Sequence, residues 1–157
     1  ESMPAELIEK IIAAKNYLAA YANVRQVSFG MTDMAWHTLK EPYTGCVVEF
    51  EHKAMAPAQV LPVVEGTALS PTFGHLFSGG YAAGYYGYKW AEVMSADCYG
   101  AFEEAGLADD AAVRRLGAAF RETVLALGGS RNARDVFRAF RGRDPEIAAL
   151  LRRQGLA

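Results

Sequence analysis

Apolar residues recur at three- and four-residue spacing along most of this chain, and no stretch shows sustained alternation of apolar and polar residues. The first spacing lines one face of an α-helix, whereas sustained alternation is the pattern of a half-buried strand. The sequence therefore predicts an all-α fold. The expected helices span residues 4–21, 24–39, 46–60, 82–105, 110–127, 130–141 and 145–153, and residues 61–69 are expected to form a loop.

Residues that favour helix ends stand at the borders of several of these segments. Asn23, Ser130 and either Asp109 or Asp110 are placed to cap helix N-termini, because their side chains accept hydrogen bonds from free backbone amides. Gly106 is placed to end the helix before it, because glycine readily takes the left-handed conformation found after helix C-termini. These signals predict separate helices joined by short breaks.

The length of 157 residues suffices for one domain with its own core, and we expect a single helical unit over residues 1–157. A net charge of −2 offers no bulk electrostatic attraction for nucleic acid. Residues 130–157 carry seven arginines against three acidic residues, but the interleaved phenylalanine and leucine residues favour packed amphipathic helices over an exposed basic arm. No apolar run is long enough to span a membrane, so neither nucleic acid nor membrane is an expected partner.

Three smaller features are interpreted as structural. Cys46 and Cys98 lack the spacing of a metal site, which predicts reduced, buried thiols in the cytoplasm or an organelle matrix. Asp33 and His37 stand four residues apart on an expected helix, where a carboxylate and an imidazole are able to pair. The charged run at 141–145 (Arg-Gly-Arg-Asp-Pro) is expected to form salt bridges between the end of the chain and the rest.

The segment from Pro71 to Tyr99 is the richest in chemically capable groups. By residue 88 it contains one histidine, a double glycine and four of the chain's eight tyrosines. On a helix, tyrosines 81, 85 and 88 would line one face, because they are spaced four and three residues apart. Tyr86 lies off this face and is expected in the core. Two interpretations stay open at this point: a packed aromatic stripe closed by a glycine turn, and a functional row of hydroxyl groups.

The run FGHLFSGGYAAGYYGYKWAEV, together with the later LGGS and FRGRDP, resembles the C-terminal end of the M3 (thimet oligopeptidase) family of zinc metallopeptidases. The similarity is greatest to the branch that contains oligopeptidase A and the peptidyl-dipeptidases. The opening MPAELIEKIIAAKNYLAAYANVRQVSFGMTDMAWHTL resembles the segment that follows the metal site in the same family. The resemblance therefore covers nearly the whole chain and implies the helical C-terminal portion of a zincin-like catalytic domain.

The resemblance also implies roles for six residues. His75 corresponds to a histidine beside the zinc-bound water, where it helps to hold the substrate and to stabilise the tetrahedral intermediate. Tyr88 corresponds to a tyrosine whose hydroxyl supports the developing oxyanion, a fixed donor aimed at transition-state charge. Tyr81 and Tyr85 correspond to contacts with the substrate backbone. Gly79 and Gly80 correspond to a flexible loop that closes over peptides. An additional residue between His75 and Gly79 is typical of the bacterial-type branch.

The zinc ligands of the family are missing from the sequence. In the family, two histidines of a His-Glu-x-x-His helix and a later glutamate bind zinc. This chain has three histidines, His37, His52 and His75, and no two of them are separated by three residues. We therefore expect no metal ligand here, zinc bound by residues outside the chain, and no activity of the chain alone.

The expected function is that of a C-terminal fragment of a peptidase of short peptides, in which this chain forms the substrate-side wall. Its expected partners are short peptides, the missing N-terminal part of the polypeptide, and a second copy through the exposed wall. The alternative is a catalytically inert helical module, derived from such a peptidase, that binds peptides or a partner protein.

Overall fold

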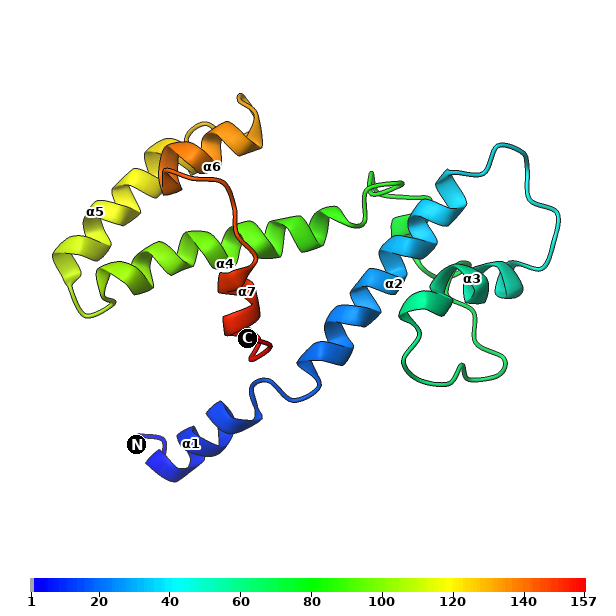
Figure 1. The fold of residues 1–157 in the computed structure, drawn as a ribbon, viewed down its shortest axis with the longest axis horizontal. Helices are drawn as coiled ribbons and strands as arrows, with labels where there is room; N and C mark the ends of the chain where they lie inside the picture. Colours follow the sequence, from blue (N-terminus) through cyan, green and yellow to red (C-terminus); the bar gives the residue numbers. More distant parts are fainter. Residues whose placement is uncertain (1) are drawn as a thin grey trace. The chain divides into compact units, whose positions relative to one another are not determined.

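The computed structural model describes residues 2–157, and within that range every regular element is helical, as the apolar spacing predicts (Figure 1). The contacts gather in two compact units, unit 1 (Glu1–Tyr88) and unit 2 (Lys89–Ala157), and the border falls inside one helix. The elements are α1 (Ala5–Ala14), α2 (Ala19–His37), α3 (Val47–Met55), the 3-10 turns η1 (Ala56–Ala58) and η2 (Gly74–Leu76), α4 (Gly87–Ala105), α5 (Asp110–Phe120), the π-helical turn η3 (Arg121–Leu125), α6 (Ala133–Arg141) and α7 (Ala148–Arg153).

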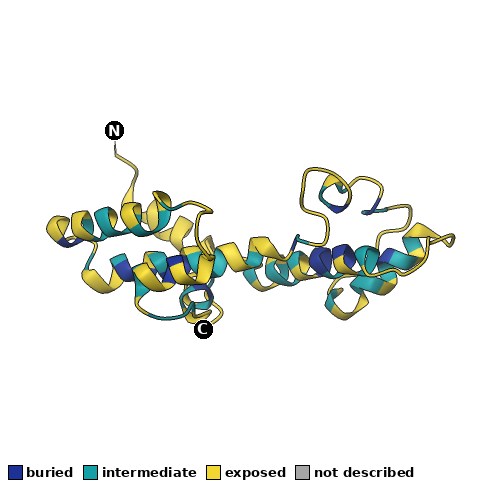
Figure 2. Ribbon diagram, turned by 90° about the horizontal axis from the view of Figure 1, so that it is seen from above, coloured by how far each residue is buried: buried dark blue, intermediate teal, exposed yellow. Residues whose placement is uncertain are grey.

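In unit 1 the core follows the second half of α2, where a short buried stretch runs from Ser28 to Asp33. Figure 2 shows such stretches as dark blue segments of otherwise exposed or half-buried helices. The helix α3 packs against α2, and its buried Glu51 accepts hydrogen bonds from the backbone amides of Leu69 (2.8 Å) and Ser70 (2.6 Å). The indole of Trp36 on α2 donates to the Ser70 hydroxyl at 2.9 Å. Side chains of two helices therefore fix the loop that leads to the tyrosine segment.

In unit 2 a buried carboxylate holds the end of the chain. Asp97 on α4 has no exposed surface and accepts hydrogen bonds from Arg141 (3.0 Å), from both terminal nitrogens of Arg143 (2.7 Å each) and from the backbone amide of Glu146 (2.8 Å). Arg141 also forms a bidentate pair with Glu104 at 2.8 and 2.9 Å. The predicted salt bridges of the 141–145 run are thus confirmed.

These contacts set the ionisation of Asp97. Burial by itself would raise the pKa of this carboxyl, but the hydrogen bonds from Arg143 and Glu146 and the charges of both arginines lower it overall. The carboxylate therefore stays charged over the neutral and mildly acidic range.

Several helix ends differ from the predicted ones. The second helix begins at Ala19, after Leu18 in a left-handed conformation, and Asn23 lies inside it and donates to the Ala19 carbonyl instead of capping. Asn132, not Ser130, caps α6 by accepting from the amide of Arg134. These predictions were wrong because side chains that favour caps also form hydrogen bonds to nearby backbone groups without starting a helix.

Other predicted ends are confirmed. Asp109 caps α5 by accepting from the Ala112 amide at 3.0 Å, and Gly106 after α4 takes a positive φ of 88°.

Among residues 2–157, none of the helices combines the length and the apolar character that a membrane span requires. Both cysteines are free thiols, but Cys46 is exposed, so its predicted burial was wrong because it precedes the first residue of α3 in an open turn.

The helix α1 carries an apolar face without a cover in unit 1. None of its residues is buried, and four large apolar side chains remain 42–65% exposed. They are Leu7, Ile8, Ile11 and Ile12. An exposed apolar stripe of this length is typical of a surface that packs against another protein segment.

Candidate functional site

Four ring side chains of unit 1 gather into one cluster, which we call the His–Tyr cluster: His75, Tyr81, Tyr85 and Tyr88. The centroid of the His75 ring lies 5.1 Å from that of Tyr81, 5.5 Å from that of Tyr85 and 5.9 Å from that of Tyr88. The rings of Tyr81 and Tyr88 are stacked at 5.2 Å, and Tyr85 lies 5.2 Å from Tyr88. All four predicted side chains of this group therefore meet at one place.

The cluster forms by a different route from the predicted one. The helix begins at Gly87 instead of Ala82, so Tyr81 and Tyr85 precede α4 and do not lie on a helical face. Consecutive turns carry them, with hydrogen bonds from Gly84 to the Tyr81 carbonyl and from Gly87 to the Gly84 carbonyl, both 2.9 Å. Residues spaced four and three apart meet through such turns as well as on a helix.

The double glycine has the backbone that only glycine takes easily. Gly79 and Gly80 have φ values of 80° and 79°, and both are exposed. A Cβ at Gly80 would meet no atom within 4 Å, so the backbone conformation, not lack of space, requires glycine there. The loop function of this pair stays a prediction.

The three tyrosines of the cluster differ in exposure. Tyr81 is 42% and Tyr88 39% exposed, whereas Tyr85 is 8% exposed and donates its hydroxyl to Gln26 on α2 at 2.6 Å. Tyr81 and Tyr88 are therefore exposed residues, whereas the Tyr85 hydroxyl is held inside. The prediction that Tyr86 lies in the core was wrong: Tyr86 is 52% exposed, because its segment forms turns before α4 and not the expected helix.

The hydroxyl of Tyr88 is a persistent hydrogen-bond donor. Its side-chain hydrogen bond with Tyr81, together with partial burial and the neighbouring Tyr81 and Tyr85, raises the pKa of Tyr88 to about 12. Tyr88 therefore stays protonated through the physiological pH range and is able to donate to a carbonyl oxygen or an oxyanion.

This elevated pKa predicts a change of stability in strong base. Between pH 10.0 and about 12 the folded state binds more protons at Tyr88 than the unfolded state does. Its contribution to stability is therefore complete below pH 10.0 and is lost as the pH rises to about 12. Urea unfolding at stepped pH measures this decline, and Tyr88→Phe should remove the Tyr88 part of it. An unchanged decline in the variant would contradict the assignment.

Asp33, which was interpreted as structural from the sequence, holds the turn that precedes α4. Asp33 on α2 has no exposed surface and accepts hydrogen bonds from the amides of Ala83 and Tyr85, both at 2.9 Å. The predicted pair with His37 is confirmed, with Nδ1 lying 3.0 Å from Asp33 Oδ1. The spacing of Asp33 and His37 indicated the pair, but no signal in the sequence indicated amides fifty residues further along.

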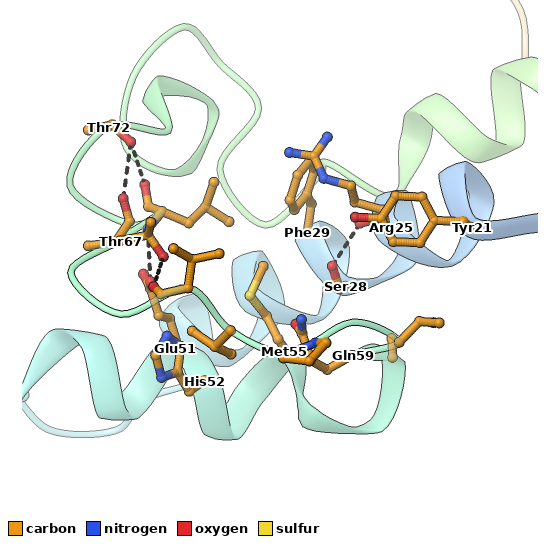
Figure 3. A pocket seen from close by; sticks show the side chains of 17 residues that line it. Tyr21, Arg25, Ser28, Phe29, Glu51, His52, Met55, Gln59, Thr67 and Thr72 are labelled. Carbon is orange, nitrogen blue, oxygen red and sulfur yellow. Dashed lines mark hydrogen bonds between the residues drawn. The ribbon is translucent and has the colours of Figure 1, made fainter. Parts of the chain in front are cut away.

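A separate cavity of about 360 Å³ opens in unit 1 among α2, α3 and the loop after η1 (Figure 3). At one side the guanidinium of Arg25 lies over the Phe29 ring, 4.7 Å from its centroid. The carboxylate of Glu51 belongs to the lining, but it is engaged by the two loop amides. Phe29 lines this cavity and also contacts the cluster, with its ring centroid 6.0 Å from that of Tyr85, so the cavity adjoins the cluster.

The described part of the chain, residues 2–157, contains no group of three histidine, cysteine, aspartate or glutamate side chains that could hold a metal ion. The rings around His75 are those of Phe73 and of the three tyrosines of the cluster. The groups that this site offers to a ligand are hydroxyls, one imidazole and the exposed backbone of the double glycine.

Comparison with known proteins identifies the family of the chain. The family model of peptidase family M3 matches residues 1–156. The chain is 43% identical to the organellar oligopeptidase A of Arabidopsis thaliana, 39% to the oligopeptidase A of Escherichia coli and 35% to the dipeptidyl carboxypeptidase of Escherichia coli. Each match covers 99% of this chain but only 20–22% of the relative, so the chain spans about a fifth of their length. The chain belongs to peptidase family M3.

Proposed function

We propose that residues 1–157 are the C-terminal part of the catalytic domain of a zinc-dependent peptidase of short peptides, and that the His–Tyr cluster lines the substrate side of its active site. The family supports peptide hydrolysis, and the relatives are named oligopeptidases and dipeptidyl carboxypeptidases. The observation that carries the proposal is the pair of exposed, stacked hydroxyl-bearing rings of Tyr81 and Tyr88 beside the double glycine.

The chemistry of the cluster suits the stabilisation of an attacked carbonyl group. When a peptide carbonyl becomes tetrahedral, its oxygen gains negative charge, and fixed donors aimed at that oxygen lower the barrier. Tyr88 supplies such a donor, because a tyrosine hydroxyl keeps its proton at neutral pH. Tyr81 is placed to bind the peptide backbone next to it, and the imidazole of His75 packs against both rings.

The zinc of the proposed enzyme has no fitting site in this chain, since residues 2–157 bring no three metal-ligating side chains together. No step is therefore assigned to a metal held here, and the ligands belong to residues outside the chain. We also propose that the exposed face of α1 packs against that remaining part, and that the chain by itself self-associates through it and hydrolyses no peptide. Relatives named cytosolic and organellar support a cytoplasmic or organelle-matrix location.

The substrate role of Tyr81 is tested by Tyr81→Phe in the full-length polypeptide with a fluorogenic short peptide. The ring and its stack on Tyr88 are kept, whereas the side-chain hydrogen bond with Tyr88 and one hydrogen bond to the peptide are lost. The bond to the peptide is worth about 1 kcal/mol. We expect KM to rise by roughly fivefold with kcat changed less.

Tyr86→Phe is the matched control, because Tyr86 lies in the same turn, is exposed and has no ring contact with the cluster. It should leave both constants unchanged. Equal effects of the two substitutions would contradict a specific role of Tyr81. A full-length protein that binds peptides at this surface without any cleavage would instead support the inert binding module.

A further inference from the structure

We infer that Asp33 is a positioning residue of the candidate site, which fixes the turn between Tyr81 and α4 and so holds Tyr81 and Tyr88 in place for the peptide. The inference rests on the proposed function of the His–Tyr cluster. Asp33 does not touch the substrate in this account and acts through the backbone of the turn.

The geometry assigns one carboxylate oxygen to each of two amides. Oδ1 accepts from Ala83 and Oδ2 accepts from Tyr85, both at 2.9 Å, and the side chain is completely buried. The turn between the double glycine and α4 is thereby tied to α2 at two points. The Tyr85 ring lies 5.2 Å from the Tyr88 ring, so the two hydrogen bonds to Asp33 also help to fix the position of Tyr88.

The backbone between these two amides is strained. Ala83 has a φ of 53°, in the left-handed region that residues with a Cβ seldom adopt. Such a conformation persists only where its surroundings determine it, and these positions concentrate at functional sites. Here the determining contact is the hydrogen bond from the Ala83 amide to Asp33.

A second contact fixes the carboxylate itself. His37, one turn further along α2, places its Nδ1 3.0 Å from Asp33 Oδ1 and 2.7 Å from the Asp33 carbonyl oxygen. The imidazole ring also packs against the ring of Phe77, 5.6 Å away, in the segment just before the double glycine. The carboxylate thus lies beside the His37 imidazole on α2 as well as the two amides of the turn.

The test is Asp33→Asn in the full-length polypeptide. Asparagine has the same size but only one acceptor oxygen, so one amide of the turn loses its partner and faces an NH₂ group. Displacement of catalytic groups by about 1 Å costs up to about a hundredfold in rate. We expect kcat to fall between about tenfold and a hundredfold, with KM changed much less.

Two readouts separate positioning from general stability. In a double-mutant cycle with Tyr88→Phe, the double variant should lose less kcat than the product of the two single losses, because both residues act through one cluster. Fully multiplicative losses would overturn the inference. In addition, the difference in tyrosinate absorbance between proteins with and without Tyr88→Phe isolates the titration of Tyr88. In the Asp33→Asn background the pKa of Tyr88 should lie closer to its ordinary value, because the Tyr81 hydroxyl is no longer held beside it.

Asp97→Asn is the control. Asp97 is an equally buried carboxylate that accepts a hydrogen bond from a backbone amide, and it lies in unit 2, which contains no residue of the cluster. It should lower stability and keep kcat per folded molecule. Should Asp33→Asn not fold, it is made together with Ala83→Gly, because glycine takes this φ without strain.

The outcomes also separate this inference from the proposed function. A folded Asp33→Asn with unchanged kcat, beside a Tyr88→Phe with lowered kcat, overturns the role of Asp33 alone. An unchanged Tyr88→Phe overturns the proposed function, and with it the basis of the inference.

Discussion

Replacing Tyr88 with phenylalanine is expected to lower the kcat of the full-length polypeptide for short peptides by about a hundredfold or more, with little change in KM. The phenol donates a hydrogen bond to an oxygen whose charge develops mainly in the transition state, so its loss affects turnover more than binding. The ring itself, and its stack at 5.2 Å on Tyr81, is retained in the variant.

Steady-state kinetics over a range of peptide concentrations separates the two constants. Tyr86→Phe serves as the control, because it removes the hydroxyl of another exposed tyrosine, which lies in the turn just before α4. Turnover of Tyr88→Phe at the parent level would remove Tyr88 from the chemistry. An increase of KM with unchanged kcat would assign Tyr88 to ground-state binding instead.

The second large effect is expected for stability. Asp97→Ala should lower the free energy of unfolding by roughly 3–5 kcal/mol, because removal of one partner of a buried ion pair leaves the other charges uncompensated. The arginines concerned are Arg141 and Arg143, which both bond to the Asp97 carboxylate. Urea denaturation measures the difference. Asp144→Ala is the control, because Asp144 also pairs with two arginines, Arg134 and Arg138, but at the surface.

Little change is expected for Asp144→Ala, since exposed ion pairs contribute little. Equal effects of the two substitutions would contradict the account of the buried site. The same site predicts acid sensitivity: the pKa of Asp97 is lowered in the folded state, so its contribution is present above the unfolded pKa and is lost as the pH falls through the folded one.

The fold class follows from the sequence because helical spacing is a local property. Predicted helix ends fail where a polar residue has two local choices: Asn23 bonds back to Ala19 inside α2, and Ser130 bonds to Leu127 while Asn132 takes the cap. These choices are decided by packing that is not local.

The membership of the His–Tyr cluster was predictable, whereas its construction was not. The run FGHLFSGGYAAGYYGY contains His75 and the three tyrosines of the cluster, but their spacing is compatible both with a helix and with consecutive turns. What selects the turns is Asp33, whose partners Ala83 and Tyr85 lie fifty residues away. The left-handed backbone of Ala83 follows from that contact, and an alanine in a sequence gives no sign of it.

The most direct measurement is a crystal structure of the full-length polypeptide with a short peptide whose scissile bond is replaced by a tetrahedral phosphinate. We expect the Tyr88 hydroxyl about 2.5–3.0 Å from a phosphinate oxygen, with the Tyr81 hydroxyl hydrogen-bonded to the peptide next to it. A peptide bound away from residues 75–88, with both hydroxyls facing open solvent, would contradict it.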